Sequence, residues 1–418
     1  MSNFEPLKLR RIRETLLTGM LNISPQLAEF IKEHATDDPD RIRLARKDVY
    51  GYSAGFVANQ IEARQRHQRR FPNLCSDPLT IFPPNANLEQ SSSEATAREK
   101  VDFLLKITGS VQLIIDLSTG FGVDALALST ATQKLMLVEP DAELRAITQS
   151  NTKRLLSVET IWAEQSAEEF LNLFSSKADW IYVDPSRRKG GAKVYRLEEI
   201  SPNPVMLMSR MLQCAHHVLV KASPMLDLSV ALQHWSSVKN ILILSVSNEC
   251  REVLFHLSGE EKSIPLIHCL NLTPAGRESF LFYREEEEQA NVIYSDPLSY
   301  LFEPNASVMK AGAFKLVAQR FGLHKLANHT HLYTSDVPVI GFPGRTFEVI
   351  RPLEKNDLGI QANILSRNHP LSPDEIRKKF KVTDGGDQFI IACSGVNKKF
   401  LLLTHRLNHA TPVSHQTM

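Results

Sequence analysis

The residues with the clearest chemical potential follow an apolar stretch near the first quarter of the chain. Residues 114–122 read IIDLSTGFG, so an acid, small polar residues and two glycines come directly after two isoleucines. The segment 123–128 then has the apolar spacing of a helix. A buried parallel strand that turns through glycines into a helix brings backbone N–H groups close to a ligand. The pattern predicts a site for a nucleotide-type cofactor.

Two later segments also end an apolar run in an acid. Residues 134–139 read KLMLVE, and residues 179–188 read DWIYVDPSRR. Glu139, at the end of the next strand, can accept hydrogen bonds from both hydroxyls of a ribose. Asp184 and Pro185 would end a further strand of the same sheet. The carboxyl ends of parallel strands meet at one edge, so these acids are expected to share a site.

With these three segments together, the chain resembles the class I S-adenosylmethionine-dependent methyltransferases. The resemblance implies that Asp116 and the following turn hold the methionine part of the cofactor and that Glu139 holds the ribose. It also implies that Asp184 and Pro185 lie at the acceptor. The turn residues implied as cofactor contacts are Ser118, Thr119, Gly120, Phe121 and Gly122. Ser118 stands where the family usually has its first glycine.

The acceptor motif departs from the family pattern as well. Ser186 and Arg187 stand where a second proline and an aromatic residue are usual. Arg187 or Arg188 could stack on a base or bind a phosphate, and we include both in the predicted acceptor site. Ion pairing of the two arginines with the glutamates at 198–199 is an equally good interpretation.

A dinucleotide-binding interpretation competes with the methyltransferase one. The segment 120–125, GFGVDA, fits the dinucleotide fingerprint with alanine in the third position, and Glu139 would again hold a ribose. Asp116 favours the methyltransferase, because a carboxylate before the turn suits an ammonium group and sits badly beside a pyrophosphate. The Asp-Pro motif has no counterpart in the dinucleotide pattern either.

A helix start precedes the first strand, in the segment 89–100. Ser91 and Glu94 have the spacing of a capping box, which is a sufficient structural explanation. Many methyltransferases carry a similar helix entrance over the cofactor, so the resemblance also implies cofactor contacts for Gln90 and Glu94. Both interpretations stay open.

Strands and helices alternate from residue 111 to about 283, which predicts an α/β fold with a doubly wound, mostly parallel sheet. An N-terminal helical region and small C-terminal α+β domains flank it. Residues 77–87 and the acidic run 285–288 are expected to be linkers. A single helix is expected over 307–321. The predicted division is a helical region (1–88), a methyltransferase domain (89–284), a ferredoxin-like domain (285–338) and a THUMP-like domain (339–410).

The last two of these domains rest on a resemblance to bacterial methyltransferases that end in a THUMP-like domain, some with a small ferredoxin-like domain before it. The segment 368–379, NHPLSPDEIRKK, carries the resemblance, with DGGD at 384–387 after it. THUMP domains bind RNA, so the resemblance implies an RNA partner. Residues 366–406 hold eight lysines and arginines against four acids. The predicted RNA contacts are Arg377, Lys378, Lys379 and Lys381.

Composition excludes several other classes of function. The net charge is +1, so any nucleic-acid surface must be local. Five scattered cysteines contain no CxxC pair, and no HExxH metal motif, GxSxG elbow or phosphate-binding loop occurs, so no metal is expected. Without a Pro-Cys motif, methylation at carbon 5 of a pyrimidine is not expected. No apolar stretch is long enough for a membrane span, and a cytoplasmic protein is expected.

The predicted function is S-adenosylmethionine-dependent methyl transfer, with RNA as the expected acceptor. The alternative is an RNA-binding protein whose methyltransferase domain is degenerate and does not catalyse transfer. Ser118 and the irregular Asp-Pro motif are the reasons for that alternative. Lys221 ends a predicted strand at the rim of the site, where a side chain pointing to solvent is the commoner outcome.

Overall fold

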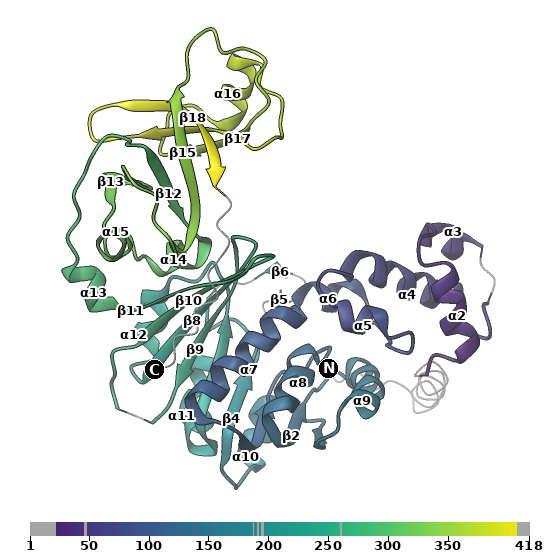
Figure 1. Ribbon diagram of the computed structural model, residues 1–418. Coiled ribbons are helices and arrows are strands. Elements are labelled where there is room, and N and C mark those ends of the chain that lie inside the picture. The colour runs from purple at the N-terminus through teal and green to yellow at the C-terminus, as the bar shows by residue number, and fades with distance from the viewer. Residues whose placement is uncertain are drawn as a thin grey trace. The chain divides into compact units, whose positions relative to one another are not determined.

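The computed structural model describes residues 22–45, 48–186, 188–189, 192–193, 196–259 and 261–407 (Figure 1). The chain divides into two compact units. The first contains Met1–Lys221 and Leu257–Glu260, and the second contains Ala222–His256 and Glu261–Met418.

The first unit is built around five parallel strands in the order β7-β4-β1-β2-β3. Their central residues are buried and apolar, as expected for parallel strands covered on both faces. The strands are β1 (Val111–Asp116), β2 (Thr132–Val138), β3 (Glu159–Ala163), β4 (Ala178–Val183) and β7 (Ala215–Ala222), with a short pair β5 (Arg188–Lys189) and β6 (Ala192–Lys193) after β4.

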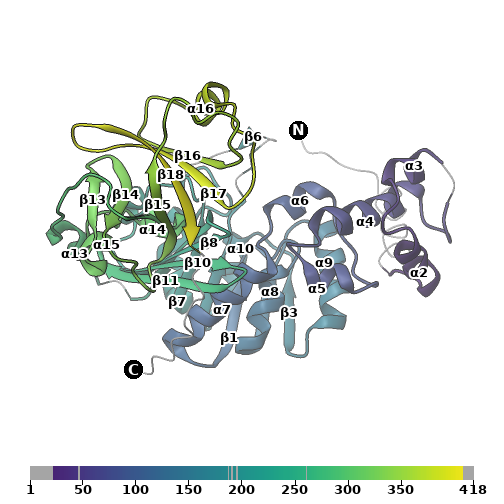
Figure 2. The ribbon, with the colours of Figure 1, turned by 45° about the horizontal axis from the view of Figure 1, so that its top comes forward.

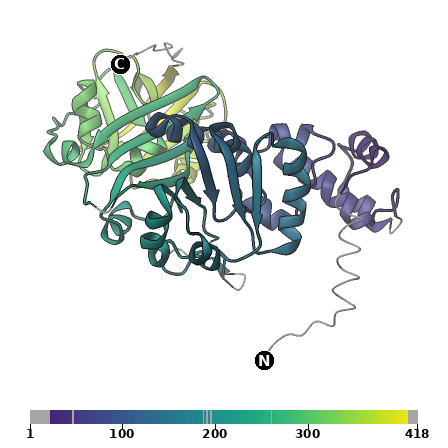
Figure 3. The same cartoon turned by 90° about the horizontal axis from the view of Figure 1, so that it is seen from below.

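Helices of the first unit lie on both faces of these strands (Figure 3). They are α7 (Glu94–Thr108), α8 (Val123–Leu128), the 3-10 turn η1 (Ser129–Ala131), α9 (Ala142–Leu155), α10 (Ala167–Leu173) and α11 (Pro204–Cys214). From β1 the chain winds through β2 to β3 on one side, and then returns to β4 and β7 on the other. The doubly wound fold is therefore confirmed, with its topological switch point between β1 and β4. Loops that leave two neighbouring strands in opposite directions open a crevice at such a point.

In the described part of the chain, the helices α2 to α6 precede α7 and the sheet, and several of them lie beyond α9 (Figure 2). Ile147 of α9 belongs to the same apolar cluster as Leu27, Ile31, Val57 and Ile61, so α2 and α4 bury their apolar faces against helix α9. These helices are α2 (Pro25–Glu33), α3 (Pro39–Leu44), α4 (Ala54–His67), α5 (Pro72–Ser76) and α6 (Asn85–Gln90).

The segment 77–87 is not the linker that its composition predicts. Two side-chain amides bind its backbone N–H and C=O groups. The Gln60 amide donates to the Phe82 carbonyl at 3.0 Å and accepts the Phe82 N–H at 2.9 Å. Asn151 does the same with Ile81, at 2.9 Å in both directions. Both apolar side chains are buried, so the segment is part of the core.

The second unit contains a smaller group of strands in the order β11-β10-β8-β9. A two-residue turn with positive φ at both Ser247 and Asn248, as type I′ hairpins require, joins β8 to β9. The elements are β8 (Val238–Val246), β9 (Glu249–Leu257), β10 (Leu266–Thr273) and β11 (Gly276–Tyr283), with helices α12 (Leu228–His234) and α13 (Arg284–Gln289).

A seven-stranded sheet in the order β13-β14-β12-β15-β18-β17-β16 follows. Helix α16 packs Ile376 and Phe380 against Ile390 and Leu403 of this sheet. The strands are β12 (Tyr300–Pro304), β13 (His324–Ala327), β14 (Thr330–Ser335), β15 (Gly344–Pro352), β16 (Asn363–Arg367), β17 (Gln388–Ser394) and β18 (Lys399–Leu407). The helices are α14 (Ala306–Ala311), α15 (Leu316–Phe321) and α16 (Pro373–Phe380).

Two expectations for this unit were wrong. The single helix over 307–321 is broken into α14 and α15, because Gly312 takes a left-handed conformation with φ +77° and ends α14. The acidic run 285–288 is not a solvated linker. It forms most of α13, and the Glu287 carboxylate accepts hydrogen bonds of 2.8–3.0 Å from the backbone N–H groups of Lys315 and Leu316, at the start of α15.

Within the described residues, every helix is too short or too polar to cross a membrane.

Candidate active site

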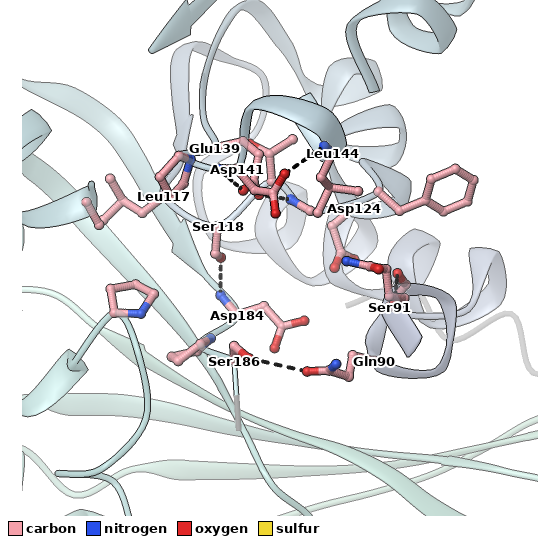
Figure 4. A pocket seen from close by; sticks show the side chains of 18 of the residues that line it. Gln90, Ser91, Leu117, Ser118, Asp124, Glu139, Asp141, Leu144, Asp184 and Ser186 are labelled. Atoms are coloured by element: carbon pink, nitrogen blue, oxygen red, sulfur yellow. Dashed lines mark hydrogen bonds between the residues drawn. The ribbon is translucent and has the colours of Figure 1, made fainter. Parts of the chain in front are cut away.

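A cavity of 440 Å³ opens at the carboxyl ends of β1, β2 and β4, where the fold has its switch point. Residues 117–124, 139–141 and 184–186 line it together with the ends of α6 and α10 (Figure 4). Its volume lies within the range of about 300–1,000 Å³ that is usual for small-molecule sites. The three motifs singled out in the sequence therefore converge on one cavity.

The turn after β1 needs glycine at two positions. Gly120 and Gly122 have φ of +55° and +83°, values that residues with a side chain rarely adopt. A Cβ on Gly122 would also lie 2.7 Å from the Cγ2 atom of Thr148 in α9. The Thr148 hydroxyl donates to the Gly120 carbonyl at 2.7 Å, so α9 holds the turn in place.

Glu139 links the ends of β1 and β2. One carboxylate oxygen accepts the Gly120 N–H and the other accepts the Asp141 N–H, each at 2.9 Å. The side chain lines the cavity, and burial raises the pKa of its carboxyl, although the two backbone N–H groups act in the opposite direction. Each carboxylate oxygen still has a lone pair for a ligand.

Asp116, the last residue of β1, does not line the cavity. Its side chain is 1% exposed; Oδ1 accepts the Ser118 N–H at 3.0 Å, whereas Oδ2 is buried without a hydrogen-bond partner. Burial, opposed by the Ser118 bond and reinforced by neighbouring carboxylates, raises the pKa of Asp116 to about 8. A buried acceptor without a partner is uncommon in proteins and marks a place where a donor is missing.

Ser118 joins the two halves of the site. Its hydroxyl accepts the backbone N–H of Asp184 at 2.6 Å, across the switch point between β1 and β4 (Figure 4). A glycine at this position could not make the bond. The departure from the usual glycine therefore has a structural role here, which the sequence alone did not indicate.

Gln90 and Glu94 have different surroundings. Gln90 lines the cavity, and its Oε1 accepts a 3.3 Å hydrogen bond from the Ser186 hydroxyl (Figure 4). Glu94 does not line the cavity: its carboxylate accepts the backbone N–H groups of Asn73 and Leu74 and so caps α5. The capping box of α7 is also shifted, since Ser93 and Thr96 form it and Ser91 ends α6.

The remaining predicted site residues are only partly described. Thr119, Phe121 and Pro185 line the cavity. Arg187 lies outside the described residues, and of Arg188 only the backbone, in β5, is described.

Behind Asp184 lies a buried polar network that the sequence analysis missed. Lys221, expected to point to solvent, is 7% exposed, and its ammonium group is 2.6 Å from Asp184 Oδ2. Lys100 of α7 is 2.7 Å from Asp124 Oδ1. The Ser92 hydroxyl lies between the two lysines, 2.5 Å from Lys100 Nζ and 3.1 Å from Lys221 Nζ. The only signal in the sequence was that Lys221, like Asp184, ends a strand.

The two carboxyl groups of the network, those of Asp184 and Asp124, have pKa values shifted in opposite directions. Burial raises the pKa of Asp184, although Lys221 and Lys100 act to lower it. For Asp124, burial also acts to raise the pKa, but the ammonium groups of Lys100 and Lys221 outweigh it, so the pKa lies below its ordinary value. Asp184 keeps 22% of its side chain exposed at the cavity. This arrangement places a carboxylate of perturbed pKa at a cavity wall, as catalytic sites commonly do.

The predicted RNA contacts lie on α16 and at its end. Arg377 is paired with Asp374 and, at 2.9 Å, with Asp384, so its charge is largely neutralised. Lys381 ends the helix in a left-handed conformation, and Lys379 lies over the Phe380 ring. Burial lowers the pKa of His369 against the opposing effect of the Leu371 N–H, and the positive charges of Lys399 and Lys379 lower it further.

The second unit has a cavity of its own, of 560 Å³, lined by α12, α13 and α14. It contains none of the motif residues and is mostly apolar. No group of three or more histidine, cysteine or acidic side chains in the described residues could hold a metal ion.

Comparisons with known proteins agree with this picture. A ferredoxin-like domain model matches residues 300–343, and a THUMP domain-like model matches residues 344–406. A crystal structure of a "putative methyltransferase" from Porphyromonas gingivalis W83 is 32% identical, covers 91% of this chain and 98% of that chain, and superposes with a TM-score of 0.81.

Two further solved structures match a smaller part of the chain. A "putative RNA methyltransferase" from Pyrococcus horikoshii is 14% identical, and the match covers 43% of this chain and 92% of that one, with a TM-score of 0.33. An rRNA methylase from Streptococcus thermophilus is 12% identical over 39% of this chain and 95% of that one, with a TM-score of 0.31. Likenesses at this level say nothing about function. No curated protein matches the sequence.

Proposed function

Because the chain belongs to the bacterial class I S-adenosylmethionine-dependent methyltransferases with C-terminal ferredoxin-like and THUMP-like domains, we propose that it transfers a methyl group to RNA. The observation that carries the proposal is the cavity at the switch point, where the loops after β1, β2 and β4 bring the motif residues together. The proposed division of the chain remains 1–88, 89–284, 285–338 and 339–410.

The residues around the cavity suit S-adenosylmethionine. Glu139 offers two free lone pairs to the ribose hydroxyls, and Pro140, Leu144 and Ala167 offer apolar surface beside it for an adenine ring. Asp116 Oδ2, the buried acceptor without a partner, belongs to the last residue of β1, directly before the turn that would hold the methionine part. S-adenosylmethionine supplies a methyl group that its sulfonium has already activated.

Asp184 and Pro185 form the acceptor side of the cavity in this proposal. Methyl transfer asks the protein to align the acceptor and to remove a proton from it. Asp184 has one carboxylate oxygen bound to Lys221, and its Oδ1 accepts no hydrogen bond from the described residues. That oxygen can accept a proton from an acceptor held in the cavity.

RNA is the proposed acceptor because of the C-terminal part of the chain. The match to a THUMP domain-like model and the exposed basic residues around α16 support an RNA partner. Since Arg377 is ion-paired, we assign most of the phosphate contacts to Lys378, Lys379 and Lys381.

The alternative function is an RNA-binding protein with a non-catalytic methyltransferase domain. The substitution of Ser118 for glycine was one reason to consider it. The hydrogen bond from Asp184 to Ser118 weakens that reason, because the serine supports the acceptor loop.

Single-turnover transfer of labelled methyl from S-adenosylmethionine to RNA tests the proposal. RNA from cells that lack the gene is the substrate, and the wild-type protein should label it. Asp184→Ala should abolish labelling and keep cofactor affinity within about tenfold, because the loss falls on the acceptor side. Asp179→Asn is the matched control: Asp179, at the other end of β4, binds the backbone of β1 at 2.8 and 2.9 Å. Cofactor binding without any transfer would favour the alternative function.

A further inference from the structure

Lys221 forms an ion pair with Asp184 of the proposed acceptor site, although no sequence motif identified it. It is the second-to-last residue of β7, the strand next to β4, and its ammonium group is 2.6 Å from Asp184 Oδ2. Only 8% of the lysine side chain is exposed, whereas Asp184 opens to the cavity. Asp184 thus faces the cavity, and Lys221 holds the Asp184 carboxylate from the buried side.

The pair continues into a connected chain of buried polar groups. Lys221 Nζ donates to the Ser92 hydroxyl, which donates to Asp124 Oδ2 at 2.7 Å. Tyr182 OH donates to the same oxygen at 2.9 Å, and Lys100 Nζ donates to Asp124 Oδ1 at 2.7 Å. The charged groups of this network come from the loop after β4 and from β7, α7 and α8.

Charged side chains from several elements of the first unit act on the pKa of Asp184. Lys221 comes from β7 and Lys100 from α7, and both lower the pKa of Asp184. Asp124 from α8 raises it, and Asp116 at the end of β1 is a further carboxylate close enough to couple with Asp184. Removal of Lys221 would leave Asp184 with two neighbouring carboxylates and one more distant lysine.

Structural stability is a poor explanation for such a pair. Burial of two charges costs about as much free energy as their attraction returns, so apolar residues usually serve stability as well or better. Here the pair lies at the wall of the cavity that holds the motif residues, where perturbed carboxylates commonly have a function.

We propose that Lys221 is a positioning residue, which acts through Asp184 by holding its carboxylate ionised with Oδ1 free to take the acceptor's proton. The proposal rests on the proposed methyl transfer. In the step, a lone pair of the acceptor atom forms the new bond to the methyl carbon, and the carbon–sulfur bond breaks with its electron pair going to sulfur. The proton of the acceptor passes to Asp184, so atoms and charges balance.

The pH dependence of methyl transfer tests this role. Loss of an opposite charge at this distance raises the pKa of a carboxyl by about 1–3 units. In Lys221→Met, the acid limb of kcat/KM should therefore move to higher pH by about 1–3 units, with the KM for S-adenosylmethionine unchanged. Lys221→Arg keeps the positive charge and should restore the limb. Lys134→Met is the matched control, since Lys134 forms only an exposed pair with Glu159 on β3.

A second measurement needs no catalysis. Carbon-13 NMR of protein labelled at aspartate carboxyls, with Asp184→Asn identifying the resonance, gives the titration midpoint of Asp184 directly. The midpoint should rise by about 1–3 pH units in Lys221→Met or Lys221→Gln and stay in Lys221→Arg and Lys134→Met. Lys221→Gln retains a hydrogen-bond donor in case the methionine variant does not fold.

The two measurements separate the possible failures. An unchanged Asp184 midpoint in both neutral variants overturns the role of Lys221. A raised midpoint in an active enzyme whose acid limb does not move overturns it as well. If the wild-type protein transfers no methyl group at all, the proposed function fails, and the NMR midpoint still decides whether Lys221 controls Asp184.

Discussion

Glu139 gives the sharpest test of the cofactor site, because the structure shows what each of its oxygens already does. Each oxygen accepts one backbone N–H, from Gly120 or Asp141, which leaves one lone pair per oxygen for a ligand. Two ribose hydroxyls can be bound in this way. Hydrogen bonds to a charged acceptor contribute about 1.5–3 kcal/mol each, and water in the open cavity would replace part of that.

Glu139→Ala should therefore weaken S-adenosylmethionine binding by about 2–4 kcal/mol, or about 30- to 700-fold in Kd. Isothermal calorimetry measures the change. Glu143→Ala, an exposed acid at the start of α9, is the matched control and should bind normally. The substitution also leaves two backbone N–H groups without an acceptor, so melting of the ligand-free protein must show that the variant is folded.

A double-mutant cycle isolates the ribose contacts from any damage to the loop. S-adenosylhomocysteine and its 2′,3′-dideoxy derivative are the two ligands. The wild-type protein should prefer the ligand with both hydroxyls, and Glu139→Ala should show almost no preference. Equal loss of affinity for both ligands in the variant would refute the ribose assignment. Tight NAD binding by the wild-type protein would refute the choice of cofactor.

Three further predictions follow from the described contacts. Burial raises the pKa of Asp116 to about 8, above its unfolded value of about 3.9, so the ligand-free protein should lose unfolding free energy as pH rises from about 4 to 8; Asp116→Asn should remove that slope in urea titrations. Ser118→Gly should lower kcat about tenfold by removing the bond to Asp184 N–H, with cofactor affinity nearly unchanged, and an unaltered kcat would contradict a role in the acceptor loop. Neutralising Lys378, Lys379 and Lys381 should weaken binding of every RNA alike and reduce the slope of log affinity against log salt by about 0.7 per lost contact on single strands. Adding a change at Arg377 should have a smaller effect, since Asp374 and Asp384 already pair with it, and an unchanged slope would favour a solvated helix face.

The ends of three strands and the position of the cavity could be predicted from local sequence. Apolar runs that end in Asp116, Glu139 and Asp184 mark strand ends, and parallel strands place those ends at one edge. The turn through Gly120 and Gly122 is equally local, because positive φ depends on the residue itself. Helix α2 likewise begins at Pro25 with Ser24 as its cap, and both signals come from neighbouring residues.

Local signals failed where a side chain had more than one possible partner. Glu94 has the spacing of a capping box, yet it caps the neighbouring helix α5, and Ser93 takes the cap of α7. The acids of 285–288 suggested solvent exposure, but Glu287 binds the backbone N–H groups at the start of α15, 28 and 29 positions later in the chain. Hydrogen-bonding capacity can be read from a sequence, whereas the choice among acceptors depends on which elements pack together.

What the sequence determined by itself was therefore the set of strand ends and the glycine turn, since each depends on residues close together in the chain. Only the tertiary structure decided the environment of Asp184. Ser118 reaches its backbone from 66 residues away, and Lys221 reaches its carboxylate from 37 residues away. Because Asp184 and Lys221 are largely buried, the lysine strongly affects the pKa of the carboxyl. A lysine beside a carboxylate has such an effect only where water is excluded. No spacing in the sequence encodes that exclusion.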